Sequence, residues 1–178
     1  MIEGLSSLEM KFEHLSSLPE AEKFMKRAMS VVQGAAKANA PVSRVSGGGA
    51  LRQSIFTDVE THPDRITGIC YTNLEYAPYV EFGTGPAGQE EHSGISPNVA
   101  VQYRQSGWVI PADAMSEGDA RAYGFPVAYG KDGQIIGYYT RGQAAQPFLY
   151  PALVNNRAAV VNELKKAINA VQRSLAND

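Results

Sequence analysis

Three glycines in the middle of the chain have the spacing of a dinucleotide-binding turn. Gly83, Gly85 and Gly88 fit G-x-G-x-x-G, in which glycines let backbone amides approach a pyrophosphate at the start of a helix. Residues 89–94, which follow, do not form the apolar face that such a helix needs. The segment is therefore interpreted as a flexible loop. The glycine run at 47–49 is not followed by Gly-Lys-Ser/Thr, so no phosphate-cradling P-loop is predicted either.

Residues 90–92, Glu-Glu-His, offer side chains of the metal-binding type. A metal site needs three or four converging groups, and the other histidines, His14 and His62, occur in unrelated segments. We therefore interpret 90–92 as a surface charge run. Cys70 stands in an apolar strand-like pattern, which indicates a buried structural thiol. Because G-x-S-x-G and H-E-x-x-H are also absent, we predict no catalytic, metal-binding or cofactor-binding residues, no cofactor, and no enzyme activity.

Size and composition limit the class of protein. The chain has 178 residues and a mass of 19.2 kDa, and 44% of the residues are hydrophobic, which suits a single packed domain over 1–178. A net charge of −2 argues against a large basic surface for nucleic acid. A single cysteine excludes a disulfide framework. The sequence shows neither a signal peptide nor an apolar run of the ~20 residues that span a bilayer. We expect a soluble protein, made inside the cell, without a membrane partner.

Helices are predicted near both ends of the chain. Residues 18–39 show helical spacing of apolar residues after a capping box of Ser17 and Glu20, and Pro41 ends this helix. A second helix is predicted over 152–175. Its apolar stripe comprises Val154, Ala158, Val161, Ile168, Val171 and Leu175. Residues 141–178 carry five basic and two acidic side chains, a balance more typical of a solvated helix face than of a nucleic-acid patch.

Strands are predicted before and between these helices. Alternation of apolar and charged residues predicts a half-buried strand over 8–13. Apolar patterns on both sides of a turn at 62–64 predict an antiparallel hairpin of residues 51–60 and 65–73. Residues 76–82 suit one or two helical turns.

The stretch from 83 to 124 is rich in Gly, Pro, Ser and Asp. It predicts a functional or disorder-prone loop with one short strand at 108–110. Asp-Gly at 132–133 then predicts a second hairpin, formed by residues 125–129 and 134–140.

These elements predict an α+β fold. A small antiparallel sheet packs against an N-terminal and a C-terminal helix, and a long loop and hairpin region is inserted between them. We predict that residues 85–145 form an extended insertion, or arm, within the single domain.

Four short segments, in order along the chain, are more informative than any catalytic motif. They are residues 35–42, 50–55, 76–84 and 146–153. Their sequences contain A-K-x-x-A-P-V, L-R-x-S-I, Y-A-x-Y-V-E-F-G-T and Q-P-F-L-x-P-A. In this order they resemble the tail-component family of long-tailed bacteriophages, which is related to the tail completion, or minor tail Z, proteins. The stretch before L-R is longer here than in the family, and the resemblance says little about the arm.

The resemblance implies a structural virion protein of a phage or prophage. It would complete the tail or join it to the DNA-filled head as a homo-oligomeric ring, commonly a hexamer, at the neck. The implied partners are further copies of the chain, a head-closure or connector protein, and a tail terminator or tail tube protein. Genome DNA would pass through without specific binding, which suits an acidic channel. The implied location is the head–tail junction of the virion, after synthesis in the cytoplasm of the host bacterium.

Other functions stay open at this point. Within the structural class, the alternative is a tail terminator or tail-tube-associated protein. Outside it, the alternatives are a small phage hydrolase, which predicts clustered titratable residues in a cleft, and a DNA-binding module that uses the basic C-terminal helix, which predicts salt-sensitive affinity for DNA.

The positions that match the family motifs are our candidate interface residues. They are Leu51, Arg52, Ser54, Ile55, Tyr76, Ala77, Tyr79, Val80, Glu81, Phe82, Gly83, Thr84, Gln146, Pro147, Phe148, Leu149, Pro151 and Ala152.

Some of these residues have a predicted physical role. The Glu81 carboxylate accepts amides from the glycine turn that follows it, pairs with Arg52, or is solvated on a short helix. Pro147 and Pro151 fix φ around Phe148 and Leu149, so these side chains plug into the core or into a neighbouring subunit. Tyr79 and Phe82 are predicted to be core residues.

Overall fold

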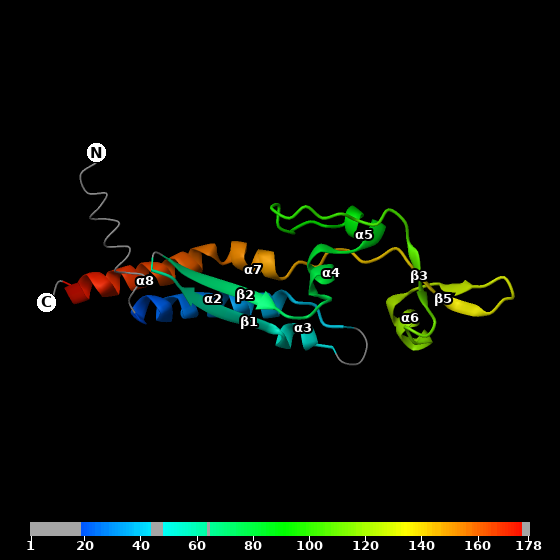
Figure 1. Cartoon of the computed structure of the whole chain (residues 1–178), viewed down its shortest axis with the longest axis horizontal. Coiled ribbons are helices and arrows are strands. Elements are labelled where there is room, and N and C mark those ends of the chain that lie inside the picture. Colours follow the sequence, from blue (N-terminus) through cyan, green and yellow to red (C-terminus); the bar gives the residue numbers. More distant parts are fainter. Residues whose placement is uncertain (1–18, 44–47, 64, 176–178) are drawn as a thin grey trace. The chain divides into compact units, whose positions relative to one another are not determined.

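The computed structural model of the chain describes residues 19–43, 48–63 and 65–175 (Figure 1). Contacts divide it into two compact units. Unit 1 comprises Met1–Ala38, Ile55–Thr72 and Ala152–Asp178, as far as these are described, and unit 2 comprises Asn39–Ser54 and Asn73–Pro151. The predicted α+β class is confirmed, because helices accompany two small antiparallel sheets. Among the described residues, no helix combines the length and the apolar character that crossing a bilayer requires.

Unit 1 begins with the long helix α2, Pro19–Asn39, which confirms the predicted N-terminal helix. Its buried face follows helical spacing, because it contains Phe24, Ala28, Met29, Val32 and Ala36. The predicted strand at 8–13 and the Ser17 cap lie outside the described residues.

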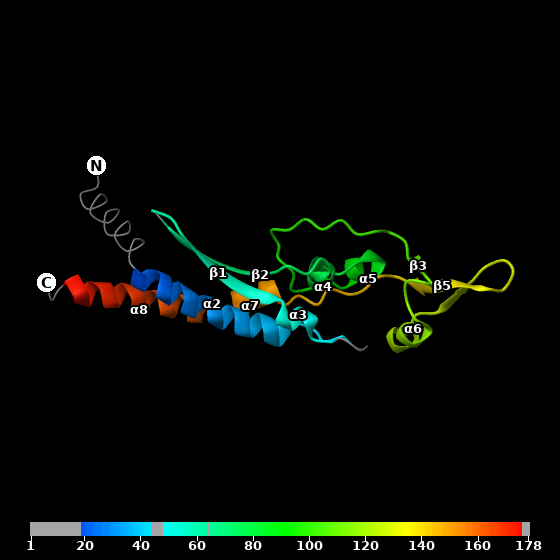
Figure 2. The ribbon, with the colours of Figure 1, turned by 60° about the horizontal axis from the view of Figure 1, so that its bottom comes forward.

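Strands β1, Ile55–Thr61, and β2, Ile66–Thr72, form the antiparallel hairpin that the sequence predicts. One face of this hairpin packs against α2 (Figure 2). A Cβ atom added to Gly68 would lie 2.6 Å from Cγ of Met29, and Gln33 Nε2 donates to the Ile55 carbonyl at 2.8 Å. Glycine in β2 therefore lets the sheet approach the helix closely.

The predicted strand over 51–60 begins too early. Residues 50–53 form the short helix α3, Ala50–Gln53, after Gly49, which has a φ of 99°. The Ser54 hydroxyl donates to the Leu51 carbonyl at 2.9 Å. A left-handed glycine before the turn and this local side-chain bond favour a helical turn over an extended backbone.

Two helices stand last in the described part of the chain. They are α7, Leu149–Asn155, and α8, Arg157–Leu175, so the predicted C-terminal helix is confirmed with an interruption at Asn156. Asn156 Nδ2 donates to the Ala152 carbonyl at 2.8 Å. Helix α8 runs beside α2 in both Figure 1 and Figure 2. In the predicted apolar stripe, however, Val154, Val161 and Ile168 are exposed.

Unit 2 contains the remaining short elements. They are α4 (Ala77–Phe82), α5 (Gly85–Glu90), β3 (Trp108–Pro111), α6 (Glu117–Tyr123), β4 (Val127–Tyr129) and β5 (Ile135–Thr140). The second sheet has the strand order β3-β5-β4, with antiparallel neighbours. This confirms the helical turns at 76–82, the strand at 108–110 and the second hairpin.

The stretch from 83 to 124 is more regular than predicted, because it also contains α5 and α6. Ser116 Oγ accepts the amide of Asp119 at 3.1 Å, and Gly124, with a φ of 74°, ends α6. These are ordinary helix start and stop signals, and they stand in this sequence within a polar segment that lacks apolar periodicity.

Candidate functional site

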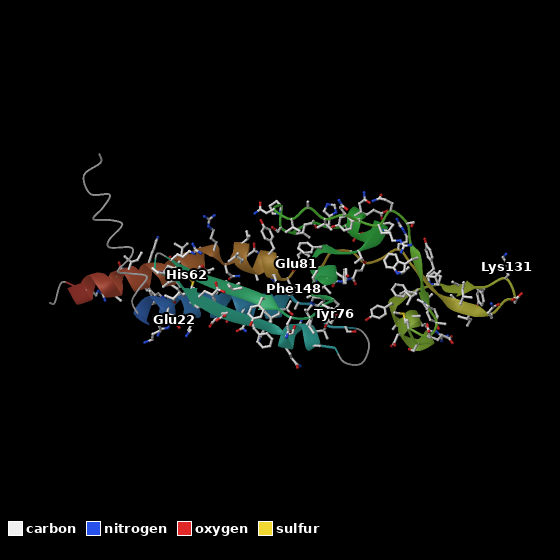
Figure 3. The ribbon with its side chains drawn as sticks, in the orientation of Figure 1. Glu22, His62, Tyr76, Glu81, Lys131 and Phe148 are labelled. Atoms are coloured by element: carbon white, nitrogen blue, oxygen red, sulfur yellow. The ribbon has the colours of Figure 1, made fainter. Side chains whose placement is uncertain are left out.

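The carboxylate of Glu81 joins two of the four motif segments. Helix α4 carries Glu81, which is only 5% exposed. Its Oε2 accepts the amides of Phe148 at 2.7 Å and Leu149 at 3.0 Å, and its Oε1 accepts the amide of Tyr150 at 3.0 Å. Figure 3 shows Glu81 and Phe148 beside each other. Amides at the start of a helix have no partner within it, so Glu81 supplies acceptors and negative charge where α7 needs both.

This geometry replaces the predicted roles of Glu81. The carboxylate does not accept amides from its own glycine turn, and it is not solvated. It does not pair with Arg52 either, because Arg52 Nε donates to the Ala40 carbonyl at 2.7 Å. Sequence reasoning considered only nearby partners and charged ones, whereas the actual partners are amides that lie 67 to 69 positions further along the chain.

The surrounding contacts hold the same two segments together. The amide of Gln146 donates to the Val80 carbonyl at 2.8 Å. Pro147, next in sequence, has no amide to satisfy. Phe148 is 0% exposed, so within this chain its side chain is a core residue rather than a plug that projects from the surface. Burial of a phenyl ring and three bonds to one carboxylate make this junction a rigid part of unit 2.

The glycine turn packs against a distant segment and is not a flexible loop. The amide of Thr84 donates to the Gln143 carbonyl at 2.9 Å, and the Gln143 amide donates back at 3.2 Å. A Cβ atom added to Gly83 would lie 2.7 Å from the Ala145 nitrogen, and one added to Gly85 would lie 2.6 Å from the Arg141 oxygen. The glycines of G-x-G-x-x-G therefore serve close backbone contact with residues 141–145.

Gln143 is the residue that sequence reasoning missed here. Its Nε2 also donates to the Tyr79 carbonyl at 2.7 Å, so Gln143, which follows β5, links α4 and the glycine turn. It pairs with Thr84 across 59 positions of sequence, and local patterns give no signal for such a pairing.

The other motif residues divide between the core and the surface. Buried are Leu51, Ser54, Ile55, Ala77, Gly83 and Ala152; intermediate are Val80, Phe82, Thr84, Pro147, Leu149 and Pro151; exposed are Arg52, Tyr76, Tyr79 and Gln146. The core prediction for Tyr79 is wrong, because this side chain is 59% exposed. Tyr79 follows Pro78 in the six-residue helix α4, and its ring faces water. The contact with Gln143 is made by the main-chain carbonyl of Tyr79 and not by its ring.

The two N-terminal motifs also meet. Arg52, from L-R-x-S-I, reaches the carbonyl of Ala40, from A-K-x-x-A-P-V. The carbonyl lies just past the C-terminus of α2, where helix carbonyls lack intrahelical partners and cations are favoured. The four motifs therefore form two intrachain junctions, Arg52 with Ala40 and Glu81 with the start of α7.

Titratable groups of the glycine-rich region pair with neighbours. Glu90 forms an ion pair with Arg141, and Nδ1 of His92 lies 3.2 Å from the Gly88 carbonyl oxygen. Within the described ranges, no three His, Cys, Asp or Glu residues come together as metal ligands would. A groove of about 610 Å³ lies beside Glu90 and Arg141. Its lining residues are Pro86, Gln89, Glu90, Gln105, Ser106, Gly107, Tyr139 and Arg141.

Burial perturbs two further groups. The Tyr103 hydroxyl donates to the Phe82 carbonyl at 2.8 Å, and burial raises the pKa of Tyr103. Burial likewise raises the pKa of the Cys70 thiol, while the Lys37 ammonium lowers it. A raised thiol pKa is typical of a structural cysteine rather than a nucleophile, although Cys70 is half-buried and not fully buried, as the sequence had indicated.

Comparison with known families agrees with the motif resemblance. Residues 8–83 match the model of the family described as "Bacteriophage HK97-gp10, putative tail-component". No curated protein and no solved structure gives a significant match to the chain. The matched range includes α2, α3, the β1–β2 hairpin and α4. The predicted family resemblance is thus confirmed: over residues 8–83 the chain is similar to the HK97-gp10-like family of phage tail components, which supports a structural role in a phage tail and a location in the virion.

Proposed function

We propose that this chain is a structural protein of the phage neck, which completes the tail or joins it to the DNA-filled head as a homo-oligomeric ring. The supporting observation is that the family match includes a sheet with one face that the described residues leave exposed. The β1–β2 hairpin packs on α2 with one face, and on the other face Phe56 and Tyr71 are each 43% exposed. The protein acts by docking, without catalysis.

The hairpin leaves one face for a partner. In the described part of the chain, β1 and β2 form a sheet of their own, in which each strand has one partner strand. Packing on α2 supports this two-stranded sheet from one side, and its other face carries the exposed aromatic side chains. A neighbouring copy would cover that aromatic face, and repetition of one such contact by rotation closes a ring.

The arm, residues 85–145, supplies a second docking surface in this proposal. Apolar side chains are exposed on its hairpin, namely Tyr129, Ile135, Ile136 and Tyr139. Exposed groups of this kind mark interaction sites. We assign this surface to the head-closure or connector protein on one side of the ring, or to the tail terminator or tail tube protein on the other.

Charge favours passage of DNA rather than its retention. Residues 86–140 carry three basic and six acidic side chains. Acidic side chains do not replace the counterions of the phosphate backbone, so a channel lined by them has little affinity for DNA. The proposal therefore needs no specific contact with the genome.

The oligomeric state tests this proposal. The protein is purified and studied by light scattering coupled to size exclusion and by negative-stain microscopy, alone and mixed with the head-closure, tail terminator and tail tube proteins of the same gene cluster. A ring that attaches to one of these partners is expected, and the partner identifies the side of the neck. A chain that stays monomeric alone and in every mixture overturns the proposal.

A further inference from the structure

The outer face of the β1–β2 hairpin is acidic as well as apolar. Because residues two apart in a strand share a face and paired residues stand side by side, this face is fixed by the register. It consists of Phe56, Asp58, Glu60, Thr67, Ile69 and Tyr71, which we call the outer sheet face. Phe56 and Tyr71 lie side by side at its base, with ring centroids 6.1 Å apart and ring planes tilted by 43°. It carries the carboxylates of Asp58 and Glu60, and at its far end His62 Nε2 lies 3.7 Å from Glu60 Oε2.

Helix α8 presents a face of the opposite charge. Arg157, Val161, Lys165 and Ile168 are spaced by four, four and three residues, so they lie on one side of the helix. We call this side the α8 outer face. All four are exposed, and Val161 and Ile168 are 39% and 38% exposed. Two cations thus alternate with two aliphatic side chains on a surface that the described residues of unit 1 leave exposed.

Arg157 is a cation without an ion-pair partner in its described surroundings. It is the first residue of α8 and follows the end of α7 by two positions. No carboxylate pairs with it among the described ion pairs. Its exposed guanidinium is therefore available to a carboxylate of a partner.

We infer that the outer sheet face of one copy docks against the α8 outer face of the next copy, and that this contact closes the ring. The inference rests on the proposed function. The two faces match in charge, Asp58 and Glu60 against Arg157 and Lys165, and in apolar content, Phe56 and Tyr71 against Val161 and Ile168. They are different surfaces of one unit, so the contact is heterologous, as ring closure requires.

Charge reversal on either face tests the contact. The helix variant is Arg157→Glu with Lys165→Glu, and the sheet variant is Asp58→Lys with Glu60→Lys. Each one places like charges opposite each other and is expected to weaken self-association at least about tenfold, measured by sedimentation velocity. Both variants change exposed side chains, so their urea unfolding midpoints should match that of wild type, and a matching midpoint shows that lost assembly is not caused by unfolding.

Mixing the two variants gives the sharper result. In a mixture, the reversed helix of one variant meets the reversed sheet of the other, and the two unaltered faces meet as well. An equimolar mixture is therefore expected to recover wild-type association, in rings of alternating copies. A contact between two α8 faces predicts instead that the sheet variant assembles normally by itself.

A control for the helix variant has the same change in net charge away from both faces. Lys23 on α2 and Lys131 at the tip of the second hairpin are exposed, and Lys23→Glu with Lys131→Glu is expected to associate like wild type. If wild type associates only with its partner proteins, the same variants are compared in that mixture. If the helix variant and the sheet variant each form rings as wild type does, this inference is overturned and the proposed function still stands. A wild-type chain that never associates overturns the proposed function itself.

Discussion

Glu81 binds the backbone of Phe148 through a bond of 2.7 Å between Oε2 and the amide nitrogen, and this one contact makes two sequence motifs a single structural element. The same carboxylate takes the amides of Leu149 and Tyr150. Y-V-E-F-G-T and Q-P-F-L-x-P-A are therefore two sides of one helix cap. A glutamate at this position is explained by its role in fixing the backbone at the start of α7, not by a catalytic role.

Removal of the carboxylate should destabilise the chain. Glu81→Ala leaves three buried or half-buried amides without an acceptor, so we expect the free energy of unfolding to fall by about 2–4 kcal/mol, measured by urea denaturation. Glu81→Gln keeps an acceptor oxygen and should lose less. Glu75→Ala, an exposed glutamate just before α4, is the control and should change little. Unchanged stability with impaired assembly would assign Glu81 to a subunit contact instead.

The glycine turn should tolerate no side chain at Gly83. Gly83 and Gly124 have φ values of 76° and 74°, but a Cβ atom meets backbone only at Gly83, since nothing lies within 4 Å at Gly124. Alanine at either position costs about 1 kcal/mol for the left-handed backbone. Gly83→Ala should lose a further ~1–3 kcal/mol from the clash. Equal melting temperatures of the two variants would contradict the close approach to Ala145.

Local sequence patterns predicted the helices and strands of this fold better than they predicted the contacts between distant segments. The helix over 18–39 and the second hairpin could be predicted because apolar periodicity and Asp-Gly act within a few residues. The short helix α3 could not, because it depends on a left-handed Gly49 that the sequence shows only as one of three glycines.

The site shows the same limit more strongly. The motif residues Glu81, Gly83 and Thr84 were identifiable, but their partners are Phe148, Ala145 and Gln143. These contacts connect positions about 60 residues apart, and no local pattern encodes which distant amide a carboxylate will meet. The G-x-G-x-x-G spacing does accompany a close approach to the glycine backbone. The group that approaches is the segment 141–145 of the same chain and not a pyrophosphate.

Cys70 should react slowly with alkylating agents in the folded chain. Burial raises its pKa and Lys37 only partly offsets this increase, so the pH midpoint of alkylation by iodoacetamide should lie above that of the chain unfolded in urea. Lys37→Gln should raise the midpoint further. A folded-state midpoint at or below the unfolded one would contradict the role of burial.

The same shift has a consequence for stability. Below the ordinary thiol pKa both folded and unfolded chains keep the proton, so the contribution of this group to stability is fully present and does not change with pH. As pH rises through the raised pKa of the folded chain, the unfolded chain has already lost its proton, so this contribution to the free energy of unfolding is lost. Cys70→Ser should remove that part of the alkaline decline, which pH-dependent urea denaturation would detect.

The arm hairpin should contribute to docking and not to folding. Tyr129 and Ile135 are paired across β4 and β5 and are 63% and 43% exposed, so Tyr129→Ser with Ile135→Lys removes little buried area. We expect a change in the free energy of unfolding within about 0.5 kcal/mol, together with clearly weaker binding to the head-closure or tail partner in a pull-down with purified proteins. Lys131→Ala, at the polar tip of the same hairpin, should bind normally. Partner binding that is unaffected by the apolar substitutions would exclude this hairpin as the docking surface, and the contact would then have to lie elsewhere in unit 2 or on the faces of unit 1.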